Sequence, residues 1–258
     1  MILSLLLFAT SALELYDQAN SLFQQRRFQE AEAALNASLR ADPNLAPALT
    51  LKGKLAMGLN RFDVARECFE KAASIEPKSP YVQFLLGFFH YVDNDFVRAI
   101  PALERARSLK PDDARTHFYL ALSQEGVANP TEATKLYLRT IELESAGGKP
   151  QADTHVAYGR LLFVQGDLNA SAKQIARALQ LDPNSRDAHY ELGRIHFENA
   201  EWSKAADGGE IALRLPGVGT TDRQIHYLLT RAYAKSGNRE AAGKHLALFK
   251  ASGASLRR

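Results

Sequence analysis

A recurring pattern of 34 residues constrains this chain more than any other feature of its sequence. Three stretches align almost without gaps: FQEAEAALNASLRADPN (28–44), FDVARECFEKAASIEPK (62–78) and FVRAIPALERARSLKPD (96–112). A small residue precedes each stretch, and the same place is filled seven times, by Ala19, Gly53, Gly87, Ala121, Gly159, Gly193 and Thr230. Successive steps are 34, 34, 34, 38, 34 and 37 residues. Such a period predicts a stack of similar units rather than one globular core.

Other positions recur in the same frame. A second small place holds Ala31, Ala65, Ala99, Ala133, Ser171, Ala205 and Ala242. Four residues later, six repeats carry a bulky residue: Leu35, Phe69, Leu103, Tyr137, Ile175 and Leu246. Prolines close four repeats, at Pro43, Pro77, Pro111 and Pro183. Small residues let two helices cross closely, bulky residues fill the space beside the crossing, and a proline ends the second helix. Each unit is therefore predicted to be a helix–turn–helix.

This pattern resembles the tetratricopeptide repeat (TPR) family. The resemblance implies an all-α fold, a right-handed superhelix (α-solenoid) of about seven helix–turn–helix units. The array is expected over residues 13–250, followed by a polar, basic tail at 251–258. The repeats are expected near 12–45, 46–79, 80–113, 114–147, 152–185, 186–219 and 223–256.

Repeat six departs from the pattern in two ways. Gly208 and Gly209 lie inside its second helix, where each costs about 1 kcal/mol relative to alanine. The segment PGVGTTD (216–222) then adds three residues before the last repeat. The sequence therefore predicts that the joint around Gly208–Gly219 opens first.

The N-terminal segment MILSLLLFATSA (1–12) is apolar and then rich in small residues. It is too short to span a bilayer. We interpret it as a short export signal, cleaved after Ala12, which would place the protein in an exported, periplasmic or secreted compartment. The alternative is an apolar cap on the first helix of a cytoplasmic protein.

The resemblance implies that the first helices of the repeats line a concave groove that binds peptides or extended protein segments. The residue after each small crossing residue is expected to face this groove. In repeats five to seven it forms an arginine ladder, Arg160, Arg194 and Arg231, with the aromatic residues Phe163, Tyr190, Phe197 and Tyr227 beside it. Repeats three and four offer an aromatic patch: Tyr81, Phe84, Phe88, Tyr91 and Phe118.

Aromatic residues and arginine are enriched in protein interfaces, and arginine grips carboxylates with two hydrogen bonds. The sequence thus predicts a partner protein or peptide with an acidic stretch on the ladder and an apolar stretch on the patch. The alternative is that the rings pack against adjacent repeats. In that case Asp153, Asp187 and Glu191 neutralise the arginines internally.

Four histidines share one place in the frame: His117, His155, His189 and His226. Equivalent places in neighbouring repeats lie roughly 10 Å apart, whereas zinc needs ligands within about 2.1 Å. Packing is therefore predicted, with no metal and no cofactor.

The sequence contains no motif of the common catalytic or phosphate-binding types. A net charge of +3 without clustered Lys or Arg does not predict a nucleic-acid partner. We expect a non-catalytic interaction scaffold. The alternative is a homo-oligomeric assembly subunit of an envelope or secretion complex.

Overall fold

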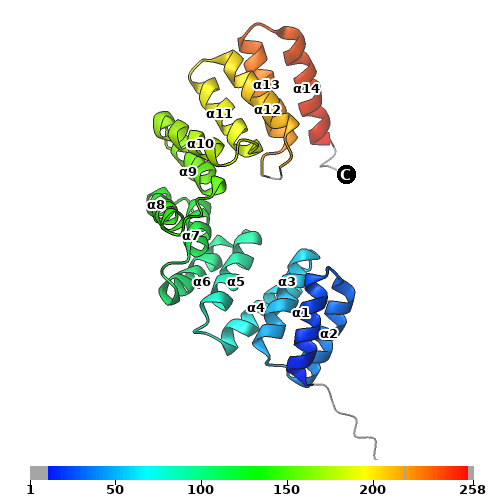
Figure 1. The fold of residues 1–258 in the computed structure, drawn as a ribbon. Coiled ribbons are helices and arrows are strands. Elements are labelled where there is room, and N and C mark those ends of the chain that lie inside the picture. Colours follow the sequence, from blue (N-terminus) through cyan, green and yellow to red (C-terminus); the bar gives the residue numbers. More distant parts are fainter. Residues whose placement is uncertain (1–10, 218, 255–258) are drawn as a thin grey trace, which may run out of the picture. The chain divides into compact units, whose positions relative to one another are not determined.

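The computed structural model describes residues 11–217 and 219–254, which form fourteen α-helices and no strand (Figure 1). This confirms the all-α class and the count of about seven helix pairs. Within the described residues, no helix is both long and apolar enough to cross a membrane. Most of the expected export signal, residues 1–10, and the end of the basic tail, residues 255–258, lie outside the described residues. Ser11 caps the first helix through its side chain, so cleavage after Ala12 would cut inside that helix.

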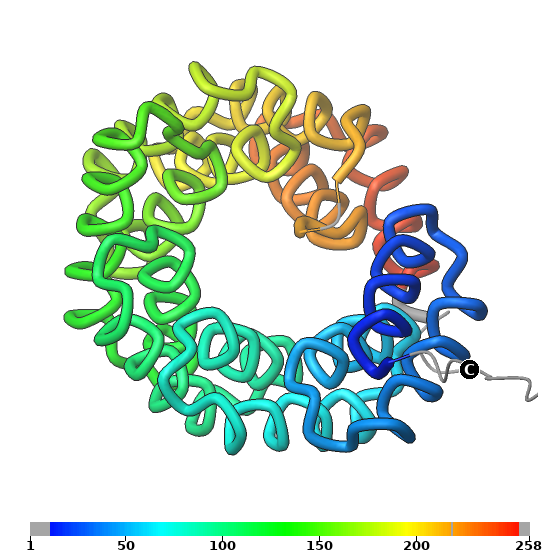
Figure 2. Tube along the Cα trace, turned by 60° about the horizontal axis from the view of Figure 1, so that its bottom comes forward, coloured from blue at the N-terminus to red at the C-terminus, as the bar shows by residue number. Residues whose placement is uncertain are grey.

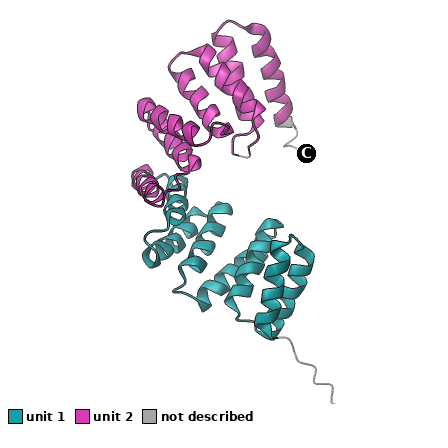
Figure 3. Cartoon of the chain, viewed as in Figure 1, with its two compact units in different colours: residues 1–129 teal, residues 130–258 magenta. Residues whose placement is uncertain are grey.

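The chain divides into two compact units between Asn129 and Pro130 (Figure 3). The helices of unit 1 are α1 Ala12–Gln24, α2 Phe28–Ala41, α3 Ala46–Gly58, α4 Phe62–Ile75, α5 Pro80–Val92, α6 Phe96–Leu109 and α7 Ala114–Gly126. Those of unit 2 are α8 Pro130–Ala146, α9 Ala152–Val164, α10 Leu168–Leu181, α11 Arg186–Glu198, α12 Trp202–Arg214, α13 Asp222–Lys235 and α14 Arg239–Ala254. The tube view shows α13 and α14 side by side at the C-terminal end of unit 2 (Figure 2).

The turn inside every helix pair has the same backbone geometry. Its middle residue has a positive φ in all seven pairs, at Arg26, Asn60, Asn94, Ala128, Gly166, Ala200 and Gly237. Glycine and asparagine tolerate this left-handed conformation, whereas alanine and arginine adopt it at a cost. The turns follow the same spacing as the small crossing residues, so the repeat frame of the sequence is also the frame of the backbone.

The small and bulky places of the frame contact one another within a pair. A Cβ added to Gly53 would lie 2.8 Å from the Phe69 ring, and one added to Gly159 would lie 2.8 Å from Ile175. The bulky residues are fully buried in the first five repeats: Leu35, Phe69, Leu103, Tyr137 and Ile175. In the pairs α3–α4 and α9–α10, a bulky side chain of the second helix thus fills the space left by the missing side chain of a glycine on the first. Leu246, assigned to the same place in repeat seven, is instead 38% exposed.

In repeat six the bulky side chain comes from the following helix, and not from the second helix of the pair. The bulky place is occupied by Gly209, and the Leu229 side chain on α13 fills the space that a Cβ at Gly209 would enter. Gly208 lies against backbone: its Cβ would be 3.0 Å from the Gly193 Cα and 3.0 Å from the His189 carbonyl oxygen. Helix α12 runs unbroken through both glycines, which are buried. Gly208 therefore permits the close approach of α11 and α12, and Gly209 leaves room for a side chain of α13.

We predict that Gly208→Ala destabilises the protein although alanine is the better helix former. The new methyl group would press on backbone atoms that cannot rotate away, which should cost about 1–3 kcal/mol. Gly243→Ala is the matched control, because nothing lies within 4 Å of its Cβ position in α14. The control should gain up to about 1 kcal/mol from helix propensity. Urea unfolding of both variants measures the difference, and a stabilised Gly208→Ala protein would contradict this account.

Candidate functional site

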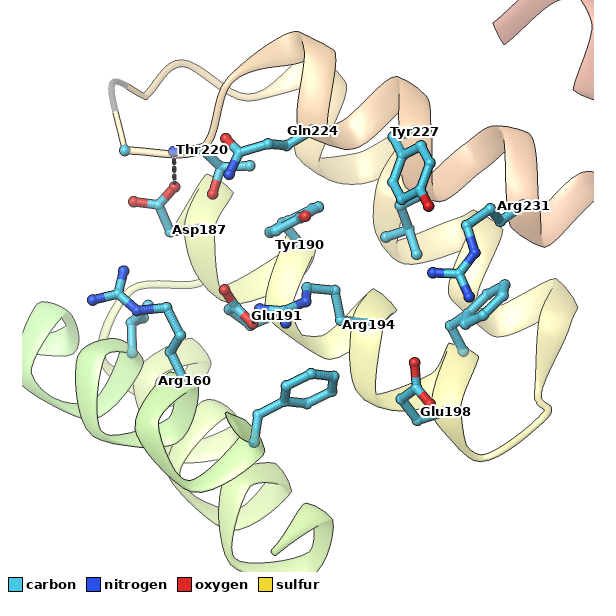
Figure 4. Close-up of a pocket in the computed structure, with 15 residues that line it drawn as sticks. Arg160, Asp187, Tyr190, Glu191, Arg194, Glu198, Thr220, Gln224, Tyr227 and Arg231 are labelled. Atoms are coloured by element: carbon cyan, nitrogen blue, oxygen red, sulfur yellow. Dashed lines mark hydrogen bonds and ion pairs between the residues drawn. The ribbon is translucent and has the colours of Figure 1, made fainter. Parts of the chain in front are cut away.

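The arginine ladder and its flanking aromatic residues line one cavity of about 420 Å³ in unit 2, here called the arginine cavity. Arg160 comes from α9, Arg194 from α11 and Arg231 from α13, the first helices of three successive pairs. The four aromatic residues predicted beside them also line it: Phe163, Tyr190, Phe197 and Tyr227. Figure 4 shows the labelled members of this set, Arg160, Tyr190, Arg194, Tyr227 and Arg231, on the three helices around the cavity. Seven residues chosen from one repeat frame are therefore brought together.

Two of the arginines stack on aromatic rings. The Arg194 guanidinium carbon lies 4.0 Å from the centroid of the Phe163 ring, and that of Arg231 lies 4.2 Å from the Phe197 ring. In both cases a ring from the preceding repeat supports an arginine of the next. Stacking uses the face of the guanidinium and leaves its in-plane N–H donors for other partners.

Glu191 neutralises one member of the ladder. Its carboxylate accepts a hydrogen bond from the Arg194 Nη1 at 2.7 Å, and its side chain is almost fully buried. Burial raises the pKa of Glu191 above its usual range, and this effect outweighs the opposing attraction of Arg194 and Arg160. The cavity therefore contains an ion pair with a buried carboxylate and a partly exposed guanidinium.

Arg160 and Arg231 have no ion pair with any residue in the described part of the chain, and both are exposed. Of the three carboxylates that line the cavity, Glu191 binds Arg194, and Asp187 accepts the backbone N–H of Thr220 at 2.6 Å. Glu198 is the exposed one. The cavity thus presents two unpaired guanidinium groups.

The loop between α12 and α13 forms part of the cavity wall through Gly219 and Thr220. The buried Arg186 donates to the carbonyl oxygens of Thr220 at 2.9 Å and Leu215 at 3.0 Å, and it also pairs with Asp222. The sequence marked this segment only as a three-residue insertion. The sequence did not predict that this segment forms a wall of the cavity, because the repeat pattern describes helices and not loops. The pattern also does not predict which groups Arg186 binds.

We predict that Arg186→Ala loosens this wall. Removing the three hydrogen bonds should speed amide exchange at Thr220 by about tenfold or more, while the core of α9 keeps its protection. Arg214→Ala is the control, because Arg214 is exposed near the same loop and has none of these contacts. Hydrogen exchange followed by NMR makes the comparison. Unchanged exchange at Thr220 would show that other contacts hold the loop.

The aromatic patch of unit 1 is largely packed. Phe84 is only 8% exposed, and its ring stacks on Phe88 with the centroids 6.0 Å apart. Tyr119 on α7, which lies outside the predicted patch, contacts four of the patch rings, those of Phe84, Phe88, Tyr91 and Phe118, with centroid separations of 4.7–5.9 Å. Of the patch, Tyr81 is the exposed residue. These rings mainly join α5 to α7.

The histidines of the shared place also pack. His117, His155 and His226 are buried, and each ring nitrogen Nδ1 has a hydrogen-bonding neighbour. His189 is less buried, with Nε2 at 3.0 Å from the Pro183 carbonyl oxygen. Among the described residues, no group of three or more His, Cys, Asp or Glu side chains could hold a metal ion.

Burial lowers the pKa of His226, as does the neighbouring His245, against the smaller opposing effects of Asp222 and Glu210. Burial also lowers the pKa of His90. The folded protein therefore binds protons at these two rings at a lower pH than the unfolded chain, which binds them below about pH 6.5.

The stability that these two rings contribute should accordingly be fully present above about pH 6.5 and fall as the pH drops below it. We predict that the variant His90→Phe/His226→Gln shows a flatter dependence of the free energy of unfolding on pH. Urea titrations between pH 5 and 8 on both proteins make the test. Equal slopes would mean that these two rings do not set the dependence.

A family model described as "Tetratricopeptide repeat" matches residues 16–80, 50–114 and 156–217, together more than half of the chain. Among curated proteins, intraflagellar transport protein 70A of Bos taurus is 25% identical over 192 residues, covering 71% of this chain and 28% of its own length. Anaphase-promoting complex subunit 3 of Schizosaccharomyces pombe is 25% identical over 228 residues, covering 87% of this chain and 33% of its own length. The chain thus spans about a third of the length of these relatives.

Solved structures share the fold. A tetratricopeptide repeat protein from Parabacteroides merdae superposes with a TM-score of 0.75 at 13% identity, covering 93% of this chain and 92% of its own. YrrB, described as a TPR protein with an unusual peptide-binding site, gives a TM-score of 0.60 at 20% identity, covering 69% of this chain and 90% of its own. At these identities the likeness concerns the fold alone.

Proposed function

Because the chain belongs to the tetratricopeptide repeat family, whose members are protein–protein interaction scaffolds, we propose that it binds an extended segment of a partner protein in the arginine cavity. The observation that carries the proposal is the convergence of seven predicted residues from three successive repeats on one cavity. The proposed activity is binding alone, with no catalytic step. The peptide-binding site named for YrrB is consistent with this proposal.

The unpaired guanidinium groups indicate what the segment carries. Arg160 and Arg231 belong to helices two pairs apart in sequence and both line the cavity. A guanidinium binds a carboxylate with two parallel hydrogen bonds, and the rings beneath Arg231 hold it in place for such a grip. We therefore propose that the segment carries a carboxylate, from an acidic side chain or a chain end. The Glu191–Arg194 ion pair lies in the same cavity.

We place the binding site in unit 2 rather than on the aromatic patch of unit 1. Phe84 is buried, and the rings of Phe88 and Tyr91 pack against Tyr119. Phe88, Tyr91 and Phe118 are only partly exposed, so these rings offer less apolar surface to a partner than an exposed ring does. We therefore do not propose that an apolar stretch of the partner binds to this patch.

We predict that Arg160→Ala/Arg231→Ala weakens binding of the partner by about tenfold or more, because each lost charged hydrogen bond is worth roughly 1.5–3 kcal/mol. Arg177→Ala/Arg214→Ala removes the same charge from the second helices α10 and α12 and should bind like the parent. Quantitative mass spectrometry of proteins retained from native extract makes the measurement.

A partner held equally by all three proteins would move the interface away from the cavity. Light scattering on the purified chain tests the rival role as an assembly subunit. A stable oligomer without any ligand would favour that role. The name of one relative, anaphase-promoting complex subunit 3, is consistent with it. A monomer would favour the binding module.

A further inference from the structure

A second cavity of unit 2, about 730 Å³, adjoins the arginine cavity. It lies between the first turns of α13 and the last turns of α14 and is lined by Tyr190, Arg223, Gln224, Tyr227, Phe249 and Ser252, among others. Tyr190, Gln224 and Tyr227 line both cavities. These three side chains form a shared wall, so a ligand in one cavity lies next to the other.

The surface of the second cavity is mainly apolar. The Tyr227 ring is 49% exposed and its centroid lies 5.5 Å from that of Phe249. The Arg223 guanidinium carbon lies 4.8 Å from the Phe249 centroid and extends the same surface. Asp222, a carboxylate at this cavity, is already paired with Arg186. An apolar group is therefore the occupant that suits these walls.

We propose that this cavity takes a bulky apolar side chain of the same partner segment whose carboxylate enters the arginine cavity. The inference rests on the proposed function and adds the second half of the recognised pattern. Alternate side chains of an extended chain point to the same side and are separated by about 6.6 Å. Because Tyr190, Gln224 and Tyr227 line both cavities, two such side chains of one extended segment can enter one cavity each. The segment is thus of the form acidic–x–apolar, or the reverse.

Charge favours this occupant over a wholly apolar one. The two unpaired guanidinium groups of Arg160 and Arg231 line the arginine cavity, which shares this wall. An apolar segment lying across both cavities would leave these cations without a partner and would remove water from them. An acidic residue beside the apolar one satisfies both cavities together.

The test uses the full chain and a positional-scanning library of decapeptides, one set with blocked termini and one set with a free C-terminal carboxylate. The intact protein should select an acidic residue and, two positions away, Phe, Leu, Ile, Met or Trp. Replacing the selected apolar residue by alanine should weaken binding of a labelled peptide by about tenfold. Phe249→Ala should abolish the apolar selection and keep the acidic one, and Arg160→Ala/Arg231→Ala should do the opposite.

Two further variants test whether the effect of Phe249→Ala on selection is due only to a loss of folding. Ser252→Phe places a ring in the cavity while keeping Phe249, and it should also abolish the apolar selection. Leu248→Ala removes an exposed apolar side chain from the same helix without touching the cavity, and it should select like the parent.

The outcomes separate this inference from the proposed function. Acidic selection without an apolar preference overturns the inference and leaves the proposed function standing. An apolar preference that survives both Phe249→Ala and Ser252→Phe also overturns it, because the apolar group then binds elsewhere. If the intact protein selects no peptide, the proposed function fails and the inference fails with it.

Discussion

The contact between a small residue on one helix and a bulky residue on the next is the interaction on which this structure depends. Where Gly53 or Gly159 leaves out a side chain, Phe69 or Ile175 fills the space, and both bulky residues are completely buried. The contact sets how closely two helices approach and which of their faces meet. No helix of the array can bury its apolar face alone, so each pair is stable only within the stack.

The same contact determines which side chains remain available for binding. One face of each of the helices α9, α11 and α13 packs against the second helix of its pair. The residue after the small crossing residue therefore points away from that second helix. This is why Arg160, Arg194 and Arg231 reach a common cavity although they are 34 and 37 residues apart. Their aromatic neighbours follow from the same frame, since rings three and four positions away share that face of a helix.

Irregular positions show how much variation the packing accepts. In repeat six the bulky residue is missing from the second helix, and Leu229 of the following repeat takes its place beside Gly209. The inserted loop after α12 is held by Arg186 and Asp187, which replace the regular packing with hydrogen bonds to backbone. The irregular loop therefore forms a wall of the cavity. The charged groups of Arg186 and Asp187 bind this loop, so they are not available to a ligand.

The helix pairs, their frame and seven of the residues that line the arginine cavity could be predicted from the sequence, because all of these follow from local periodicity. Which charges lack an ion-pair partner depends on the packing of the helices. Glu191 pairs with Arg194, and Asp187 binds the backbone of Thr220, whereas Arg160 and Arg231 have no such partner among the described residues. The sequence equally left open that Tyr119 joins the rings of unit 1 and that Phe249 forms a second cavity with Tyr227. These contacts join different helices. The repeat pattern predicts on which face of its helix a residue lies, but it does not predict which residue of another helix lies against it.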